Sequence, residues 1–197
     1  MALGIHSDTG SFTFESSTSR DVRALAWLMD QGASQKAISD YGHKSLNSEQ
    51  QKVISEAYTK LRKVNHNGIT IGSVLVDCDS YIRGMAVVAQ NILEVSDCDV
   101  VLLAVRYPNR RKKAPNSLVL IGRANARAQN INFSKLLEPF GGGGHPKASS
   151  ASIRLDHKHE MKNFGLDEKI ENVTAEVIVD SLICRIKDEQ IGKQDRA

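Results

Sequence analysis

Four consecutive glycines, Gly141–Gly144, stand directly before His145 in the stretch FGGGGHPKASSA at positions 140–151. Glycine has no Cβ, so its backbone can adopt a positive φ and can lie close to another group, at a cost in conformational entropy. Open backbone amides can form an anion-binding concavity, and a histidine at its edge can donate a hydrogen bond to a phosphate. The residue types therefore indicate a phosphate-binding segment, with a flexible loop and a surface histidine as the alternative.

Two common glycine-rich phosphate sites do not fit this stretch. A P-loop requires Gly-Lys-Ser/Thr after the glycines, whereas His145-Pro146-Lys147 follows them here. A dinucleotide-binding loop leads from a strand into a helix. The pattern here predicts the reverse order, because a helix is expected over 131–140 and a strand over 149–155.

Two further groups of residues could take part in chemistry. The basic run Arg-Arg-Lys-Lys at 110–113 could contact nucleic-acid phosphates, with a solvated loop as the alternative. Asp77 and Asp79 flank Cys78 at the end of an expected strand, where they could contact a substrate; capping of the helix expected from Tyr81 by Asp79 or Ser80 is the alternative.

The composition is that of an ordinary globular protein. Of the 197 residues, 41% are hydrophobic and 25% are charged, and a net charge of +3 is too small to argue for an anionic partner. An aromatic content of 5% disfavours extended base-stacking surfaces. The three cysteines lack CxxC spacing, which favours a reducing compartment over disulfides or zinc. Because neither a membrane-spanning run nor a signal-peptide pattern is found, we expect a cytoplasmic protein without membrane contact.

Hydrophobic periodicity predicts a helical first part. The apolar ALGI at 2–5 reads as a strand, a helix is expected between Ser19 and Gly32, and further helices are expected over 34–42 and 47–64. From residue 69 onward the pattern changes to strands and helices. The expected elements are a strand over 69–78, a helix over 81–95, strands over 99–107 and 117–124, a helix over 131–140, a strand over 149–155 and a last helix over 167–189. The order β-α-β-β-α-β predicts a compact α/β domain with a mixed sheet.

Two motifs resemble a known family. The IGRA strand, the short helix and GGGGHPKASSAS resemble the signature of the C-terminal domain associated with DHH-family phosphoesterases. SDTGSF and the following FESSTSRDVRALAWLMDQGA resemble the last motif of the DHH catalytic domain and the helix after it. The motifs occur in the family's order and at about its spacing. RecJ-like exonucleases, nanoRNA and pAp phosphatases, cyclic dinucleotide phosphodiesterases and exopolyphosphatase-related proteins share this arrangement.

The resemblance implies a division of the chain. A helical remnant of a Rossmann-like DHH catalytic domain is expected over 1–46, a helical linker over 47–68, a smaller α/β substrate-binding domain over 69–156, and a C-terminal helix and tail over 157–197. Some members of the family continue from this module into CBS domains and a tRNA nucleotidyltransferase or poly(A) polymerase domain. The helix at 167–189 is similar to the start of such a continuation.

The resemblance also implies roles for individual residues. The glycine–histidine motif would contact the terminal phosphate or nucleotide, and upstream arginines would hold the phosphate, for which a guanidinium fork is well suited. These residues are Gly142, Gly143, Gly144 and His145 in the motif, and Arg123 and Arg127 upstream.

In the family, two divalent metals, usually Mn²⁺ or else Mg²⁺, clamp the phosphate and activate water. Asp8 matches one metal-ligating aspartate, but the other ligands of the family lie upstream of that position, and only seven residues precede Asp8 here. Asp156-His157-Lys158-His159 imitates part of an Asp-His-His motif on the wrong side of the glycines. We therefore expect an N-terminally truncated chain that does not hydrolyse substrate alone.

Two functions from different classes are expected. The first is the substrate-binding part of a metal-dependent phosphoesterase that acts on short RNA, DNA or nucleotide phosphates. The second is a non-catalytic nucleic-acid-binding module, for example part of a protein fused to a tRNA nucleotidyltransferase or poly(A) polymerase; a remnant without affinity is the third option. A homo-oligomer is one expected way to cover the apolar face that a truncated domain exposes.

Overall fold

The computed structural model describes residues 1–12, 17–42, 46–108, 116–155 and 174–191. The chain divides into two compact units, Met1–Ser45 and Leu46–Ala197. The basic run at 110–113 and the segment 156–159 lie outside the described residues.

The N-terminal unit contains the helices α1 (Ala2–Asp8), α2 (Ser19–Asp30) and α3 (Gln35–Gly42). The strand expected at ALGI was wrong, because this segment forms the start of α1. Thr9 N donates to Ile5 O at 3.0 Å, so the helix satisfies backbone groups that a strand without a neighbour would leave unpaired. The other two helices were expected, although Thr18, and not Ser19, is the N-cap of α2.

The C-terminal unit is an α/β fold, as expected. Its strands are β1 (Arg62–His66), β2 (Ile69–Asp77), β3 (Val100–Tyr107), β4 (Ser117–Ala124), β5 (Gly143–His145) and β6 (Ala148–Arg154). Its helices are α4 (Ser48–Lys60), α5 (Met85–Val95), α6 (Phe133–Leu137) and α7 (Ala175–Ile191), with the 3-10 turn η1 (Glu138–Phe140) after α6. The sheet has the strand order β1-β2-β3-β4-β6-β5 and is mixed, because β2 and β3 are parallel and all other pairs are antiparallel.

Strand β1 corrects the helix expected over 47–64. The helix ends at Lys60 and Leu61 is already extended, with ψ of 117°. Asn67 and Gly68 have positive φ values of 51° and 75°, which fits the two-residue turn of a tight hairpin. This turn pairs β1 with β2, so the end of the expected helix becomes an edge strand.

Helix α5 begins later than the expected residue 81. It starts at Met85, and its N-cap is Gly84 in a left-handed conformation. Asp79 therefore does not cap this helix.

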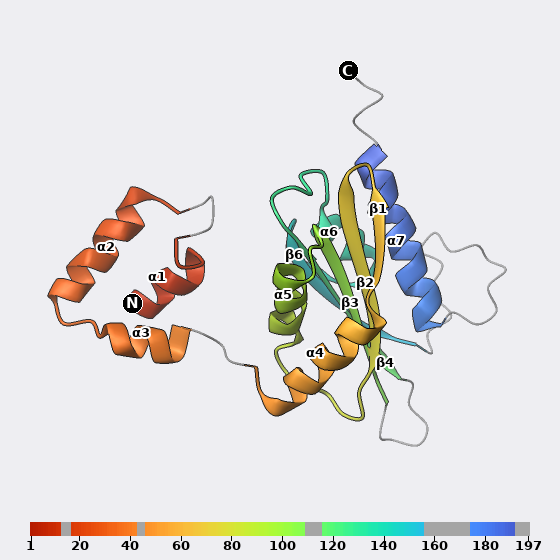
Figure 1. Cartoon of the computed structure of the whole chain (residues 1–197), viewed down its shortest axis with the longest axis horizontal. Coiled ribbons are helices and arrows are strands. Elements are labelled where there is room, and N and C mark those ends of the chain that lie inside the picture. The colour runs from red at the N-terminus through yellow and green to blue at the C-terminus, as the bar shows by residue number, and fades with distance from the viewer. Residues whose placement is uncertain (13–16, 43–45, 109–115, 156–173, 192–197) are drawn as a thin grey trace. The chain divides into compact units, whose positions relative to one another are not determined.

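Two hydrophobic cores lie on opposite faces of the sheet. On one face, Leu102 and Leu120 pack with residues of α6 and α7. On the other face, Val101 and Leu103 pack with residues of α4 and α5. Figure 1 shows α7 on one side of the sheet and α4 with α5 on the other. None of the described helices is both long and apolar enough to cross a bilayer.

Candidate functional site

The glycine stretch is a hairpin strand and not only a loop. The turn η1 ends at Gly141, which has a positive φ of 66°. Gly143–His145 then forms β5, and His145 lies opposite Ala148 on β6, so only two residues make the turn between the strands. Because β5 is the last strand of the sheet, one row of its backbone groups is not paired by a neighbouring strand.

Local packing accounts for most of the glycines. A Cβ on Gly142 would lie 2.7 Å from Ala151 Cβ, and a Cβ on Gly144 would lie 2.5 Å from Ala148 O. Gly144 also has a φ of 139°, which disfavours other residues. A Cβ on Gly143, in contrast, would meet no atom within 4 Å. Gly143 is therefore the glycine of β5 whose bare backbone the hairpin does not require.

This difference gives a paired prediction on stability. We expect Gly144→Ala to lower the free energy of unfolding by about 1–2 kcal/mol, because it combines backbone strain with a contact to the β6 backbone. Gly143→Ala should change it by less than about 0.5 kcal/mol. Urea unfolding followed by circular dichroism measures both variants, and equal midpoints would show that the hairpin does not hold Gly144 as described.

Arg123 and His145 lie in one row across three strands. Arg123 on β4 is opposite Ala148 on β6, and His145 on β5 is opposite the same Ala148. Residues directly opposite in antiparallel strands point to the same face of a sheet. Two strand spacings place the Cα atoms of Arg123 and His145 about 10 Å apart. The structure therefore brings together two of the residues that the sequence singled out, on one face.

The part of the sheet that holds this row is open. Helices α4 and α5 bury the β2–β3 part of the same face and also Ile121 on β4, but Ser150, Ser152 and Arg154 on β6 remain exposed. We call the surface formed by β5, β6 and the two ends of β4 the open face. Its polar and charged side chains are those of Ser117, Arg123, His145, Ser150, Ser152 and Arg154.

Arg123 is a half-buried cation. Burial lowers the pKa of its guanidinium, which still remains charged, as arginine does in proteins. Its Nη1 donates to Gly122 O at 2.8 Å. Across the described residues, no carboxylate forms an ion pair with Arg123. A desolvated cation with free donors can be compensated by a bound anion.

Arg127 has different surroundings. Its Nη1 lies 3.3 Å from Asp99 Oδ1, and the Arg127 side chain is exposed whereas that of Asp99 is buried. Asp99 also accepts hydrogen bonds from Thr70 N at 2.9 Å and from Asn125 Nδ2 at 3.0 Å. Arg127 therefore contacts a buried carboxylate that joins the ends of three strands.

Lys147 fixes the hairpin that presents His145. Its Nζ donates to the carbonyl oxygens of Ala128, Gln129 and Ile131, the last two at 3.1 and 3.3 Å. Burial lowers the pKa of Lys147, and nearby Glu189 partly opposes this effect. Sequence analysis did not single out Lys147, because its partners lie in a loop that only the fold brings close.

The described residues do not fit the two-metal site that the family resemblance implies. Asp8 is exposed at the end of α1. Within the described segments, no three His, Cys, Asp or Glu side chains come together in a way that could hold a metal. A two-metal centre requires several oxygen ligands, which one carboxylate cannot supply.

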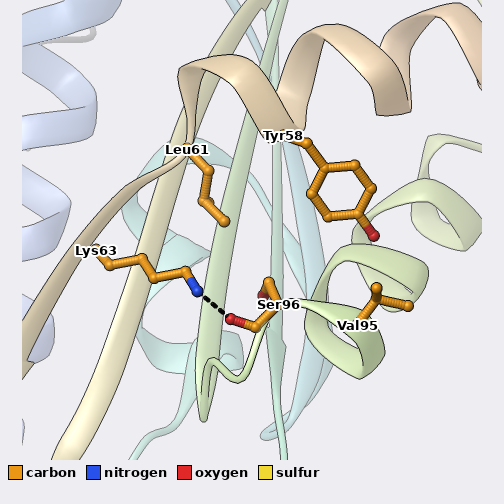
Figure 2. Close-up of a pocket in the computed structure, with 5 residues that line it drawn as sticks. All are labelled: Tyr58, Leu61, Lys63, Val95 and Ser96. Carbon is orange, nitrogen blue, oxygen red and sulfur yellow. Dashed lines mark hydrogen bonds between the residues drawn. The ribbon is translucent and has the colours of Figure 1, made fainter.

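Two of the hollows away from the open face contain residues of interest for function. Figure 2 shows the larger one, of about 620 Å³, where Lys63 Nζ donates to the backbone oxygen of Ser96 beside Tyr58, Leu61 and Val95. The Lys63 ammonium thus already donates a hydrogen bond to a backbone carbonyl.

The smaller hollow has a volume of about 240 Å³ and contains Asp77, Cys78 and Asp79. Burial raises the pKa of the Cys78 thiol to about 11, so the thiol stays protonated at neutral pH and is a poor nucleophile.

Comparisons with known proteins give two kinds of similarity. No protein-family model matches the chain. An A-adding tRNA nucleotidyltransferase of Geobacter sulfurreducens is 31% identical over 154 residues, which is 78% of this chain and 16% of that protein. Another from Aquifex aeolicus is 25% identical over 191 residues, 97% of this chain and 20% of that protein. The chain thus spans a fifth or less of the length of these relatives.

Solved structures show the fold. An exopolyphosphatase-related protein from Bacteroides fragilis matches with a TM-score of 0.59 and 14% identity, over 94% of this chain and 49% of that one. A pGpG-specific phosphodiesterase, PggH, from a Vibrio species matches with a TM-score of 0.43 and 15% identity, over 95% of this chain and 57% of that one. The expected α/β fold is therefore shared with the exopolyphosphatase-related protein.

Proposed function

We propose that this chain is the substrate-binding part of a DHH-type phosphoesterase module, and that its open face binds the phosphate end of a short RNA, DNA or nucleotide. One observation carries the proposal: Arg123 and His145 lie in register on one uncovered sheet face, and Arg123 has no carboxylate partner among the described residues. The fold shared with an exopolyphosphatase-related protein supports it.

The chemistry of the open face suits a phosphate. A guanidinium can donate two parallel hydrogen bonds to phosphate oxygens, and a histidine can donate one or carry a charge. Lys147 and Ser149 hold the hairpin rigidly, since Ser149 Oγ donates to His145 O at 2.7 Å. Hydrolysis is not assigned to this chain, because the residues described do not fit a two-metal centre.

A second candidate is a non-catalytic RNA-binding module of a longer protein. The similarity to two A-adding tRNA nucleotidyltransferases over 78% and 97% of this chain favours it. Both candidates use the same phosphate site and differ in the kind of longer protein to which the site belongs, a phosphoesterase or an RNA-processing protein without phosphoesterase activity.

Binding is tested by titrating the protein into short 5′-phosphorylated RNA that carries a fluorophore at its 3′ end. We expect Arg123→Ala to weaken binding about 10- to 100-fold, the loss of a charged hydrogen-bond pair worth about 1.5–3 kcal/mol. Arg123→Lys should recover only part of the affinity, because it keeps the charge without the fork. The control is Arg62→Ala, an exposed arginine on β1 at the opposite edge of the sheet.

Two results would contradict the proposal. If wild type does not bind phosphorylated RNA or nucleotide, or if Arg123→Ala weakens binding no more than Arg62→Ala, the open face is not a phosphate site. The same samples incubated with Mn²⁺ test whether the chain hydrolyses its ligand. Release of product at a rate that depends on Mn²⁺ would contradict the assignment of binding without hydrolysis, which both candidates share.

A further inference from the structure

We infer that the open face continues along β6 from Arg123 to Arg154 as a track for the phosphate backbone of a single-stranded oligonucleotide. The inference rests on the proposed function, in which the Arg123–His145 end holds the terminal phosphate. It adds a second phosphate contact at Arg154 and therefore a preference for ligands several nucleotides long.

The register of β6 defines the length of this track. Ala148 lies opposite both Arg123 and His145, and Arg154 lies opposite Ser117 at the other end of β4. Side chains at every second position share one face of a strand, so Ser150, Ser152 and Arg154 all point to the open face. At about 3.4 Å per residue, Ala148 and Arg154 are about 20 Å apart along the strand.

The charges on this face have one sign. Among the described residues of β4, β5 and β6, the positions that point to the open face include no aspartate or glutamate. Nor does any carboxylate in the described segments pair with Arg154.

Two other arginines of this unit form ion pairs. On β3, Arg106 forms an ion pair with Asp77 and a second with Glu176 at 3.2 Å. Arg127 contacts Asp99. Arg123 and Arg154 have no such partner among the described residues, so both are available to an external anion.

Along β5 and β6, the residues of the open face between the two arginines are small. Gly143, Ala148, Ser150 and Ser152 place no bulky side chain there, whereas Val119 and Ile121 of β4 lie beside them and pack against the core under α4 and α5. A phosphodiester backbone can therefore approach the sheet closely, and the two exposed serine hydroxyls can donate hydrogen bonds to phosphate oxygens. Since no aromatic ring lies on these positions for base stacking, binding should depend on length and salt and not on base sequence.

The span selects the ligand length. Stacked nucleotides advance about 3.4 Å along one strand, so about 20 Å corresponds to about six nucleotides, or fewer if the strand is extended. A mononucleotide reaches only the Arg123–His145 end. We expect an oligonucleotide of about six nucleotides to contact both ends.

The test compares wild type, Arg154→Ala, Arg154→Lys and the control Arg62→Ala by titration at two salt concentrations. The probes are a 5′-mononucleotide, a 5′-phosphorylated dinucleotide and a 5′-phosphorylated oligonucleotide of about eight nucleotides. Wild type should bind the long probe at least about tenfold more tightly than the mononucleotide, one charged contact being worth that much. Arg154→Ala should remove this gain, leave mononucleotide affinity unchanged and reduce the salt slope by about 0.7. Arg154→Lys should keep most of the gain.

The outcomes separate this inference from the proposed function. If wild type binds none of the probes, the proposed function fails and the track fails with it. If wild type binds mononucleotide and long probe equally, or if Arg154→Ala changes neither the length dependence nor the salt slope, the track is overturned while the phosphate site stands. Arg154 is exposed, so its variants should fold, and unchanged thermal unfolding verifies this.

Discussion

Replacing Gly122 by alanine is expected to lower the free energy of unfolding of the sheet unit by about 3 kcal/mol, the upper part of the range for overpacked cores. A Cβ at this position would lie 2.1 Å from Cδ1 and 2.4 Å from Cε1 of Phe133. Phe133 is the first residue of α6 and only 1% exposed, and its ring packs in the core on that face of the sheet, so it has no free space to enter. The strand backbone or the ring must therefore move.

Urea unfolding followed by far-ultraviolet circular dichroism measures this effect. Tryptophan fluorescence is not suitable, because Trp27 lies in the N-terminal unit. Gly143→Ala is the matched control, because its Cβ would meet no atom within 4 Å. A second variant, Gly122→Ala combined with Phe133→Leu, should be more stable than the sum of the single changes, since the smaller side chain relieves the contact. An unchanged midpoint for Gly122→Ala would mean that the ring is not seated against Gly122.

Local patterns were sufficient for the buried strands and insufficient for the edges. The run at 99–107 is almost wholly apolar because β3 is buried on both faces, and this apolar run can be recognised in the sequence alone. The residues of β1 continue the helical periodicity of α4, and the turn at Asn67-Gly68 was the signal that could have corrected the expectation. Strand β5 consists of two glycines and a histidine, which have no strand preference, so only its pairing with β6 makes it a strand.

The sequence predicts some residues of the candidate site but not how they are arranged. Arg123 and His145 could be named from the motifs, because their chemistry and their family resemblance are local properties of the sequence. The row that joins them through Ala148 depends on the register between strands far apart in the chain. The same register places Arg154 on the open face, and no local pattern indicates it.

Asp99 is the most consequential residue that the sequence did not single out. It is 2% exposed and lies directly before β3. Its carboxylate accepts from Thr70 N and Asn125 Nδ2, while its own N donates to Thr70 O at 2.8 Å and its carbonyl accepts from Asn125 N at 2.9 Å. One side chain thus ties the beginning of β2 to the loop that follows β4 and carries Arg127.

Asp99→Ala is therefore expected to lower the free energy of unfolding by about 2–4 kcal/mol, because two hydrogen bonds to a buried charged acceptor are lost. The loss leaves the half-buried Thr70 N–H and Asn125 amide without their acceptor, at about 1–2 kcal/mol each. The exposed Arg127 ion pair contributes little, since solvent screens it. Asp99→Asn should cost less, because it keeps one acceptor oxygen in place. It provides a measurable value if the alanine variant does not fold.

Asp97→Asn is the matched control, two residues away, exposed, and able to keep the positive φ of 54° found at Asp97. Its midpoint in urea should match that of wild type, while that of Asp99→Asn should fall clearly below it. Equal midpoints for the two asparagine variants would contradict the network.

Loss of Asp99 should also loosen the loop at 125–132. Asn125 Oδ1 accepts a hydrogen bond from Arg127 N at 2.9 Å, and Lys147 Nζ donates to carbonyl oxygens of the same loop, so a change at Asn125 affects the whole loop. A larger rise in hydrogen exchange at Arg127 than at the core amides of β3 in Asp99→Asn would then separate loosening of this loop from a uniform loss of stability.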